Sequence, residues 1–346
     1  MQSIRYGVMV LLLVVVVVPA AGPVRVRAQG VSDAPPDFMT LITAGDVMQH
    51  IKALAGDIGA RRAGSEEEAQ TAAYIADQLA GWGYAVALQE FETDAWSEDD
   101  EFEGEIISQN VIATRAGRAD ATRMIVVGAH MDSVDAGTGA GDNASGVAAM
   151  LAVAEALAGF DTAYTLVFIA FGAEESGDPS GAAVYVESLG DDIEQVIAMI
   201  NIDSVGIGTD LNVYAGAIVG RTGADGSSQF TGGPVWVRDL ALALADEMGL
   251  SFTTTPPESW NGFTGDWSDH YAFVEAGVPV AYFEAWQWIG PENLWWGQET
   301  PEGDYLHTRR DVIENVVPEK VERVAAVVAA TVYEIGFTAE GAKNAE

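Results

Sequence analysis

The sequence predicts an α/β protein of one domain, in which helices flank both faces of a mixed, mainly parallel central sheet. Short apolar runs typical of buried strands alternate along the chain with segments whose apolar residues recur at helical spacing. Such alternation implies right-handed crossovers between neighbouring strands. The 346 residues contain neither an internal repeat nor a change of composition that would mark a second domain.

The N-terminal segment, residues 1–28, is expected to be a secretory signal peptide. Arg5 precedes an apolar run from Val8 to Val18, and small residues follow up to Ala28. This run is much shorter than the roughly 20 apolar residues that a membrane-spanning helix needs. We therefore expect export, cleavage after Ala28 or near residues 20 and 21, and a mature protein without a membrane span.

The remaining elements follow in order between two short tails. The tails are expected at 29–40 and 338–346, and a single folded domain at 41–337. Apolar residues at helical spacing predict helices over 46–54, 66–82, 144–157, 180–189, 234–248, 269–275 and 318–335. Continuous apolar runs predict strands over 85–91, 124–129, 165–171, 196–202 and 278–283.

The composition excludes several classes of function. With 16 basic residues against 52 acidic ones, the net charge of −36 repels nucleic acids and anionic lipid surfaces. The absence of cysteine removes disulfides, thiol catalysis and Cys-ligated zinc, so a metal would need carboxylates and some of the four His. The acidic runs at 66–68 and 98–101 are expected to be solvated surface, and adaptation to high salt is the alternative interpretation.

Three predicted strands end in residues that can bind metal. The strand 124–129 runs into His130 and Asp132, the strand 165–171 into Glu174 and Glu175, and the strand 196–202 into Asp203. Carboxyl ends of parallel strands meet at one edge of a sheet, where α/β proteins place their sites. His and carboxylates without Cys suit a catalytic zinc site.

Two further residues, Asp142 and His307, fit the same chemistry. Each has a simpler alternative when taken alone, because Asp142 could be a helix N-cap and His307 a surface histidine. The Glu174-Glu175 pair could likewise be solvated carboxylates at a strand end. The coincidence with three strand ends favours a common metal site.

Together these residues resemble the secreted di-zinc aminopeptidases of peptidase family M28, which also contains carboxypeptidases and glutaminyl cyclases. The resemblance covers roughly residues 45–335 and includes further short motifs in family order. These motifs lie at 59–65, 72–84, 109–113, 268–270, 277–279 and 307–311. The resemblance implies a zinc-exopeptidase fold, two Zn²⁺ ions per chain and hydrolysis of N-terminal residues from peptides or proteins.

The resemblance also implies a role for each site residue. His130 and Asp203 would be terminal ligands of one zinc, Glu175 and His307 of the other, and Asp142 would bridge both. Glu174 would be the general base, and Asp132 would orient His130 from behind, as carboxylates commonly do for ligating histidines.

The chain departs from the family pattern just before His307. Some relatives have a Tyr there that stabilises the oxyanion, whereas this chain has Leu306 with Tyr305 one residue earlier. Tyr305, Tyr271 or a zinc ion alone are the candidate oxyanion donors.

Other aromatic and histidine side chains have less specific expectations. His270 is expected near the site behind the ligands, and His50 on the surface of the first helix. Trp288 and Trp295 are expected either to form a wall of an apolar side-chain pocket or to pack in a loop.

The leading interpretation is an exported zinc-dependent aminopeptidase. The alternatives within the family are a carboxypeptidase or dipeptidase and a glutaminyl cyclase. A non-catalytic binding protein of the same fold is a rival of another class, although such a protein would be expected to lose metal ligands. The sequence contains no Gly-x-Ser-x-Gly elbow, Walker loop or His-Glu-x-x-His helix, and it indicates no oligomeric state.

Overall fold

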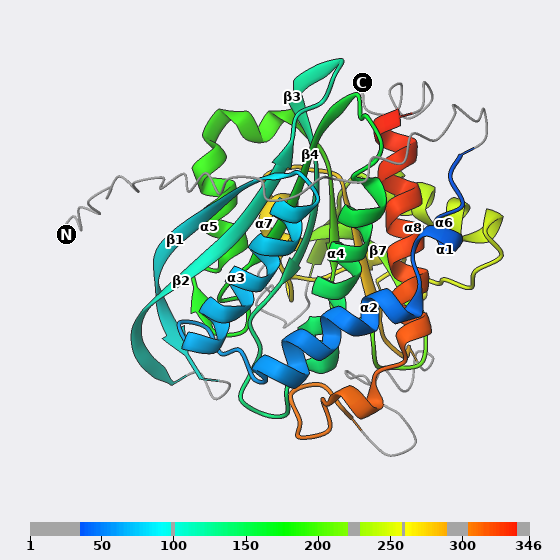
Figure 1. The fold of residues 1–346 in the computed structure, drawn as a ribbon. Helices are drawn as coiled ribbons and strands as arrows, with labels where there is room; N and C mark the ends of the chain where they lie inside the picture. The colour runs from blue at the N-terminus through cyan, green and yellow to red at the C-terminus, as the bar shows by residue number, and fades with distance from the viewer. Residues whose placement is uncertain (1–34, 98–100, 221–228, 258–259, 289–303, 338–346) are drawn as a thin grey trace.

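The computed structural model describes residues 35–97, 101–220, 229–257, 260–288 and 304–337. The expected signal peptide, the tail at 338–346 and Trp295 lie outside these residues. The described chain has the mixed α/β architecture that the sequence predicts, with one large sheet between two layers of helices (Figure 1).

Apart from α1, which was not predicted, the helices lie where the apolar periodicity predicts them, within a few residues at each end. They are α1 (Phe38–Leu41), α2 (Ala44–Ile51), α3 (Glu66–Gly81), α4 (Gly146–Leu157), α5 (Gly181–Leu189), α6 (Trp236–Glu247), α7 (His270–Glu275) and α8 (Pro318–Phe337). The first, α1, crosses the expected boundary between tail and domain at residue 40, and its Phe38 is buried. Among the described residues, no helix combines the length and the apolar character required to cross a bilayer.

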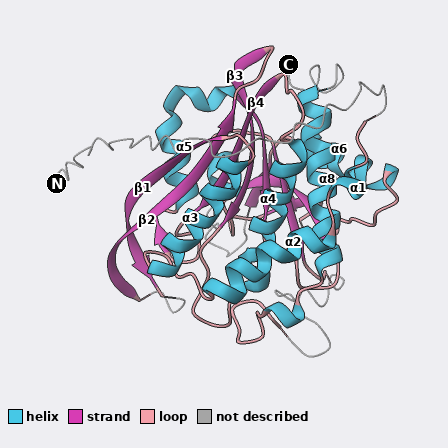
Figure 2. Ribbon diagram, in the orientation of Figure 1, coloured by secondary structure: helices cyan, strands magenta, loops and turns pink. Residues whose placement is uncertain are grey.

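The strands are more numerous than the sequence predicts. They are β1 (Ala85–Trp96), β2 (Phe102–Arg115), β3 (Asp120–His130), β4 (Tyr164–Phe171), β5 (Gly177–Asp178), β6 (Val196–Ile202), β7 (Leu211–Gly220), β8 (Gln229–Gly232), β9 (Phe263–Thr264) and β10 (Val280–Ala285). The long β1–β2 hairpin is prominent at the edge of the sheet (Figure 2). Both strands alternate between buried and accessible residues along much of their length, so a search for continuous apolar runs finds only the first part of β1.

The sheet has a parallel centre and antiparallel flanks. Its strand order is β5-β1-β2-β4-β3-β6-β10-β7-β8, with β9 paired to β7. The neighbours β4, β3, β6 and β10 run parallel, whereas β2 joins β4 and β7 joins β10 in antiparallel register. The carboxyl ends of the four central strands therefore lie at one edge.

Alternating side chains of the central strands fill two separate cores. In β4, Leu166, Phe168 and Ala170 pack with α2, α3, α4, α6 and α8, whereas Val167 and Ile169 point to the opposite face, with α5 and α7. Figure 1 views the sheet from the side of the larger helical layer. Burial on both faces explains why these strands are continuous apolar runs in the sequence.

Two expected surface residues are buried instead. Glu68 is only 1% exposed, and its carboxylate accepts hydrogen bonds from the Ser108 hydroxyl and the Gly64 N–H. Burial raises the pKa of Glu68 to about 7. His50 is 7% exposed and shares a 2.7 Å hydrogen bond with the Tyr74 hydroxyl, and burial lowers its pKa to about 4. In both cases a polar residue lies on the buried side of a helix and has a hydrogen-bond partner more than 20 residues away in the sequence.

Candidate metal centre

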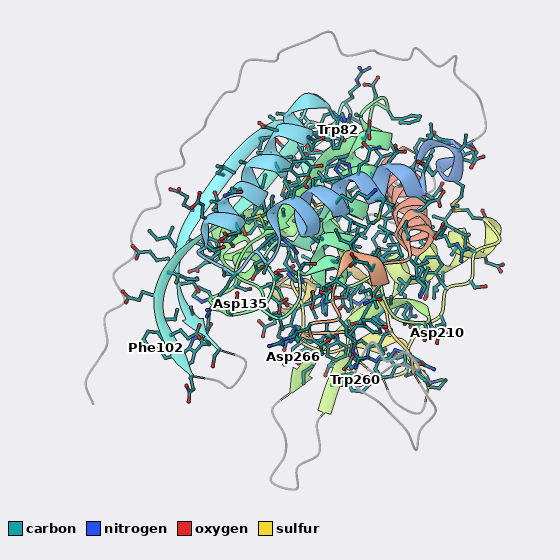
Figure 3. All side chains as sticks on the ribbon, turned by 60° about the horizontal axis from the view of Figure 1, so that its bottom comes forward. Trp82, Phe102, Asp135, Asp210, Trp260 and Asp266 are labelled. Atoms are coloured by element: carbon teal, nitrogen blue, oxygen red, sulfur yellow. The ribbon has the colours of Figure 1, made fainter. Side chains whose placement is uncertain are left out.

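The parallel centre of the sheet delivers the predicted residues to one edge. His130 is the last residue of β3, Asp203 directly follows β6, and Glu174 and Glu175 follow β4 in a short turn. The segment Ala140–Ser145 and the residues before α8 add Asp142 and His307. Figure 3 brings this end of the molecule forward, with Asp135 and Asp266 labelled on it.

Two groups of potential ligands form around Asp142. The Nε2 atom of His130 lies 3.1 Å from Asp142 Oδ1 and 3.2 Å from Asp203 Oδ1. The Nε2 atom of His307 lies 3.0 Å from Glu175 Oε2 and 3.3 Å from Asp142 Oδ2. In each group the ligand atoms lie within 4.8 Å of one another, and the two oxygens of Asp142 face different histidines.

The donor set fits divalent cations. Ligand atoms about 3.0–3.5 Å apart match the edges of a coordination shell with metal–ligand distances of about 2.0–2.2 Å. Several buried atoms in the groups have no hydrogen-bond partner among the described residues, including Asp142 Oδ1 and Glu175 Oε1. Burying such unpaired oxygens costs free energy, and a bound cation would offset that cost.

The clustered carboxylates make the site strongly favourable for positive charge. Burial would lower the pKa of His130 and His307, but the neighbouring carboxylates raise it, to about 11 for His307. Burial and the charge of Asp142 together raise the pKa of Glu175 to about 7. Burial also raises the pKa of Glu174 well above its usual value. The side chains whose pKa is raised therefore hold protons more tightly, and metal cations would compete with these protons for the same atoms.

Asp132 links His130 to the turn that carries the two glutamates. Its Oδ1 lies 3.6 Å from His130 Nδ1 and accepts the Glu174 N–H at 3.1 Å, while Oδ2 accepts the Glu175 N–H at 3.1 Å. Asp132 is fully buried. One carboxylate thus fixes the position of three predicted site residues, which agrees with the expectation that it lies behind His130.

Glu174 lies beside both groups. Its Oε2 is 4.0 Å from His130 Nε2, and its carboxylate oxygen, the Glu175 carboxylate and the His130 ring nitrogen also fall within 4.8 Å of one another. The side chain is 17% exposed, so one side of it faces the open cavity in front of the ligands. This placement allows proton exchange with a molecule held between the two groups.

Asp142 does not act as a helix cap. Its backbone is non-helical, and the side chain of the next residue, Asn143, accepts the Gly146 N–H at 2.9 Å instead. The same Asn143 oxygen accepts the Ser204 N–H at 3.1 Å and so ties the loop of Asp142 to the residue after Asp203. The Asp142 carboxylate remains available for cations.

Asp311 and Arg61 are supporting residues whose roles the sequence did not reveal. Asp311, 3% exposed, accepts the backbone N–H of Gly141 at 2.5 Å and of Asp142 at 3.1 Å. The fully buried Arg61 donates to four carbonyl groups, among them those of Met131 and Gly139 at 2.9 and 2.8 Å. In the sequence, the two residues were marked only by the short family-like motifs that contain them, at 59–65 and 307–311.

Strained backbone concentrates at the same place. Among the described residues, four non-glycine residues have positive φ, and three of them adjoin the site. Ala173 (55°) precedes Glu174, Ser204 (52°) follows Asp203, and His307 itself has a φ of 53°. Such conformations cost about 1–3 kcal/mol each and persist where the surrounding packing enforces them.

A cavity of about 450 Å³ opens in front of the two groups. Beyond the five potential ligands and Glu174, it is lined by Ser204, Asp266, Trp267, Tyr282, Glu284, Trp286, Trp288 and Leu306. Trp288 therefore forms part of the wall, and its indole N–H donates to the Tyr214 hydroxyl at 2.8 Å. The cavity is less apolar than expected, because the carboxylates of Asp266 and Glu284 also line it.

The remaining predicted residues do not reach the cavity wall. Tyr305 is buried in the larger core, and Tyr271 packs against the core of α5 and α7. His270 is fully buried, its Nε2–H donates to the Gly265 carbonyl at 2.8 Å, and its ring stacks on the Tyr282 ring at a centroid distance of 4.6 Å. Tyr282 is the tyrosine that lines the cavity, and the sequence analysis did not single it out.

Comparisons with known proteins identify the family of this chain. The family model for Peptidase family M28 matches residues 110–332, more than half of the chain. Aminopeptidase YwaD of Bacillus subtilis is 31% identical over 232 residues, which are 66% of this chain and 44% of YwaD. The chain thus spans less than half the length of that relative.

Solved structures show the same fold. A zinc aminopeptidase from Bacillus subtilis has a TM-score of 0.67 at 20% identity, with 88% of this chain and 97% of that one covered. A glutaminyl cyclase from Porphyromonas gingivalis has a TM-score of 0.63 at 19% identity, with 85% and 99% covered. With the family model matched across the strands that carry His130, Glu175 and Asp203, the chain belongs to peptidase family M28.

Proposed function

We propose that this chain is a di-zinc aminopeptidase that removes N-terminal residues from peptides. The observation that carries the proposal is the position of Asp142, whose two oxygens face two different histidines. A carboxylate placed in this way is suited to bridge two cations. The name of the relative YwaD and the description of the similar Bacillus structure as a zinc aminopeptidase support this choice of reaction.

The ligand assignment follows from the two groups. His130 and Asp203 would hold one ion, Glu175 and His307 the other, and Asp142 both. Zinc at these positions would polarise the scissile carbonyl and make the attacking water more acidic. Three carboxylates and two neutral imidazoles around two divalent ions leave one net positive charge, which favours an oxygen nucleophile at the site.

Glu174 is assigned the proton transfer. It accepts a proton from water as the water oxygen bonds to the carbonyl carbon, and it returns that proton to the nitrogen as the C–N bond breaks. Such a positioned base contributes typically about 10²–10⁴-fold to the rate. Asp132 positions this base, because it accepts the backbone N–H of Glu174.

The test of the base is the variant Glu174→Gln. We expect a wild-type zinc content by elemental analysis and a kcat about 10²–10⁴-fold lower on a peptide with a free N terminus. Glu187→Gln, an exposed glutamate on α5, is the matched control and should retain full activity. Near-normal turnover by Glu174→Gln would remove Glu174 from this role.

The test of the reaction uses one peptide with its N terminus free or acetylated, with and without a chelator, read by mass spectrometry. Stepwise loss from the free N terminus only, abolished by the chelator, is the expected result. Cleavage of both forms from the C-terminal end would indicate a carboxypeptidase instead. A peptide that begins with Gln and loses only ammonia would indicate a glutaminyl cyclase.

We also propose that the protein is exported, with residues 1–28 as the signal peptide and 338–346 as a C-terminal tail. The basis is the basic, apolar and small-residue pattern of the first 28 residues. N-terminal sequencing of the protein from the culture medium should begin at Gln29. A retained Met1 would contradict the cleavage.

A further inference from the structure

A fourth central strand also brings a carboxylate to the site. Glu284 lies in β10, which pairs in parallel with β6 so that Phe283 is opposite Ile202. The next residues of the two strands, Glu284 and Asp203, therefore lie side by side at the same edge of the sheet. Glu284 lines the cavity but belongs to neither group of potential metal ligands.

The Glu284 carboxylate is buried and incompletely paired. The residue is 4% exposed, and Oε1 accepts a hydrogen bond from the Tyr282 hydroxyl at 3.2 Å. Burial and the charge of Asp203 raise the pKa of Glu284 to about 8, although the Tyr214 and Tyr282 hydroxyls oppose this shift. Its Oε2 has no hydrogen-bond partner in the described part of the chain. Among the described residues that line the cavity, none is Lys or Arg. A buried carboxylate without a cation is costly, and a cationic ligand would remove that cost.

The walls around Glu284 suit a cation. Trp267, Trp286 and Trp288 line the cavity together with Asp266, an exposed carboxylate on the face shown in Figure 3. Indole faces attract ammonium and guanidinium groups, while their apolar area contacts the methylene groups of a long side chain. Trp288 is held in place by its hydrogen bond to Tyr214.

The charge of the whole cavity also favours a cationic ligand. Among the described residues, six carboxylates line it, four of them in or beside the metal groups, in addition to Asp266 and Glu284. This excess of acidic groups attracts the positively charged groups of a substrate, both its α-ammonium group and a cationic side chain.

We infer that this cavity receives the cationic side chain of an N-terminal Lys or Arg, with Glu284 as the carboxylate that pairs with it. This inference rests on the proposed aminopeptidase function and names its substrate class. The carboxylates of the metal groups already surround the position of the substrate backbone, whereas Glu284 lies one strand further along the sheet. A Leu side chain in the same place would leave the carboxylate buried against apolar atoms.

The first test needs no variant. Zinc-loaded wild-type protein is titrated by calorimetry with L-lysine, L-arginine and L-norleucine, the last of which resembles lysine without its ammonium group. A hydrogen bond to a charged group supports an affinity advantage of about 10–100-fold for the two cationic amino acids. Equal affinity for norleucine and lysine would overturn the inference, and this readout does not depend on whether the protein hydrolyses peptides.

The second test places the effect on Glu284. The ratio of kcat/KM for Lys-initiated over norleucine-initiated substrates is measured for wild type and for Glu284→Gln, with zinc content and thermal unfolding as checks of integrity. We expect the ratio to fall at least about tenfold in Glu284→Gln. Glu275→Gln, an exposed glutamate on α7 with the same change of charge, should leave the ratio unchanged.

The outcomes separate the possible partners of Glu284. An equal loss on both substrates would assign Glu284 to the α-ammonium group and overturn the side-chain inference. A protein that binds lysine over norleucine but cleaves no peptide would contradict the proposed hydrolysis while leaving the cationic pocket in place.

Discussion

Asp311 is predicted to be a determinant of metal affinity although it contributes no ligand. It is buried behind the bridging residue and accepts the backbone N–H of Gly141 and of Asp142. Its own carbonyl oxygen accepts the Thr138 N–H at 2.8 Å, so it also fixes the loop that precedes them. The substitution Asp311→Ala removes the carboxylate and leaves both N–H groups without their acceptor.

The magnitude follows from these two hydrogen bonds. Each buried donor left without a partner costs about 1–3 kcal/mol, so the loss of the acceptor for two donors should lower the free energy of unfolding of Asp311→Ala by about 2–6 kcal/mol. Because the freed loop carries Asp142, the affinity for zinc should also fall about 10–100-fold, as is typical when a residue that orients a ligand is removed. Asp311→Asn retains one acceptor oxygen and should show a smaller effect on both quantities.

The assay separates the two effects. Zinc affinity is measured by competition with a chelator of known affinity, and stability by urea unfolding of the metal-free protein. The exposed Glu314 lies three residues away, and Glu314→Ala is the matched control that removes a carboxylate without touching the loop. If Asp311→Ala bound two zinc ions with wild-type affinity, the argument that it positions Asp142 would be refuted.

Three further predictions concern other parts of the molecule. Asp132→Ala should lower zinc affinity and kcat together, because the same carboxylate holds the turn of Glu174 and Glu175, and both are measurable on one preparation. The pKa of His50 is lowered to about 4 in the folded protein against 6.5, so the unfolded state binds more protons and stability falls as the pH drops from about 6.5 towards 4. The full effect is about 3 kcal/mol, and urea midpoints for His50→Gln should depend less on pH over this range than those of wild type. Removal of zinc by a chelator should lower the thermal midpoint, since cations offset the repulsion among the buried carboxylates; an unchanged midpoint would contradict the proposed metal site.

The sequence was most informative where local pattern and burial coincide. The central strands are apolar on both faces, so continuous runs such as 165–171 mark them directly, and the residues after each run mark the edge where they end. The flanking strands could not be found in this way. The strands β2 and β7 pair antiparallel at the margins of the parallel centre, and β2 alternates between core and solvent, so its residues resemble an irregular segment.

The same reasoning explains the missed site residues. Glu284 follows the apolar run 278–283 as Asp203 follows 196–202, so the pattern was available, but only the sheet order places these two strands side by side. Glu68 is one of three consecutive glutamates, and nothing local distinguishes it from its exposed neighbours Glu66 and Glu67. Its burial depends on Ser108, which is 40 residues away in β2, as well as on the N–H of the nearby Gly64.

The sequence by itself determined the fold class, the family resemblance and the set of residues with metal-binding chemistry, because strand-end placement is a local property of the chain. The family resemblance already implied how these residues divide into two groups, and only the tertiary structure supplied the distances between them and the contacts that hold them. Asp142 faces both histidines, Asp132 and Asp311 hold the ligand loops, and Glu284 remains outside the metal groups. These relations depend on distances of a few ångströms between segments far apart in sequence, and such distances are fixed by the packing of the sheet and loops rather than by any local preference.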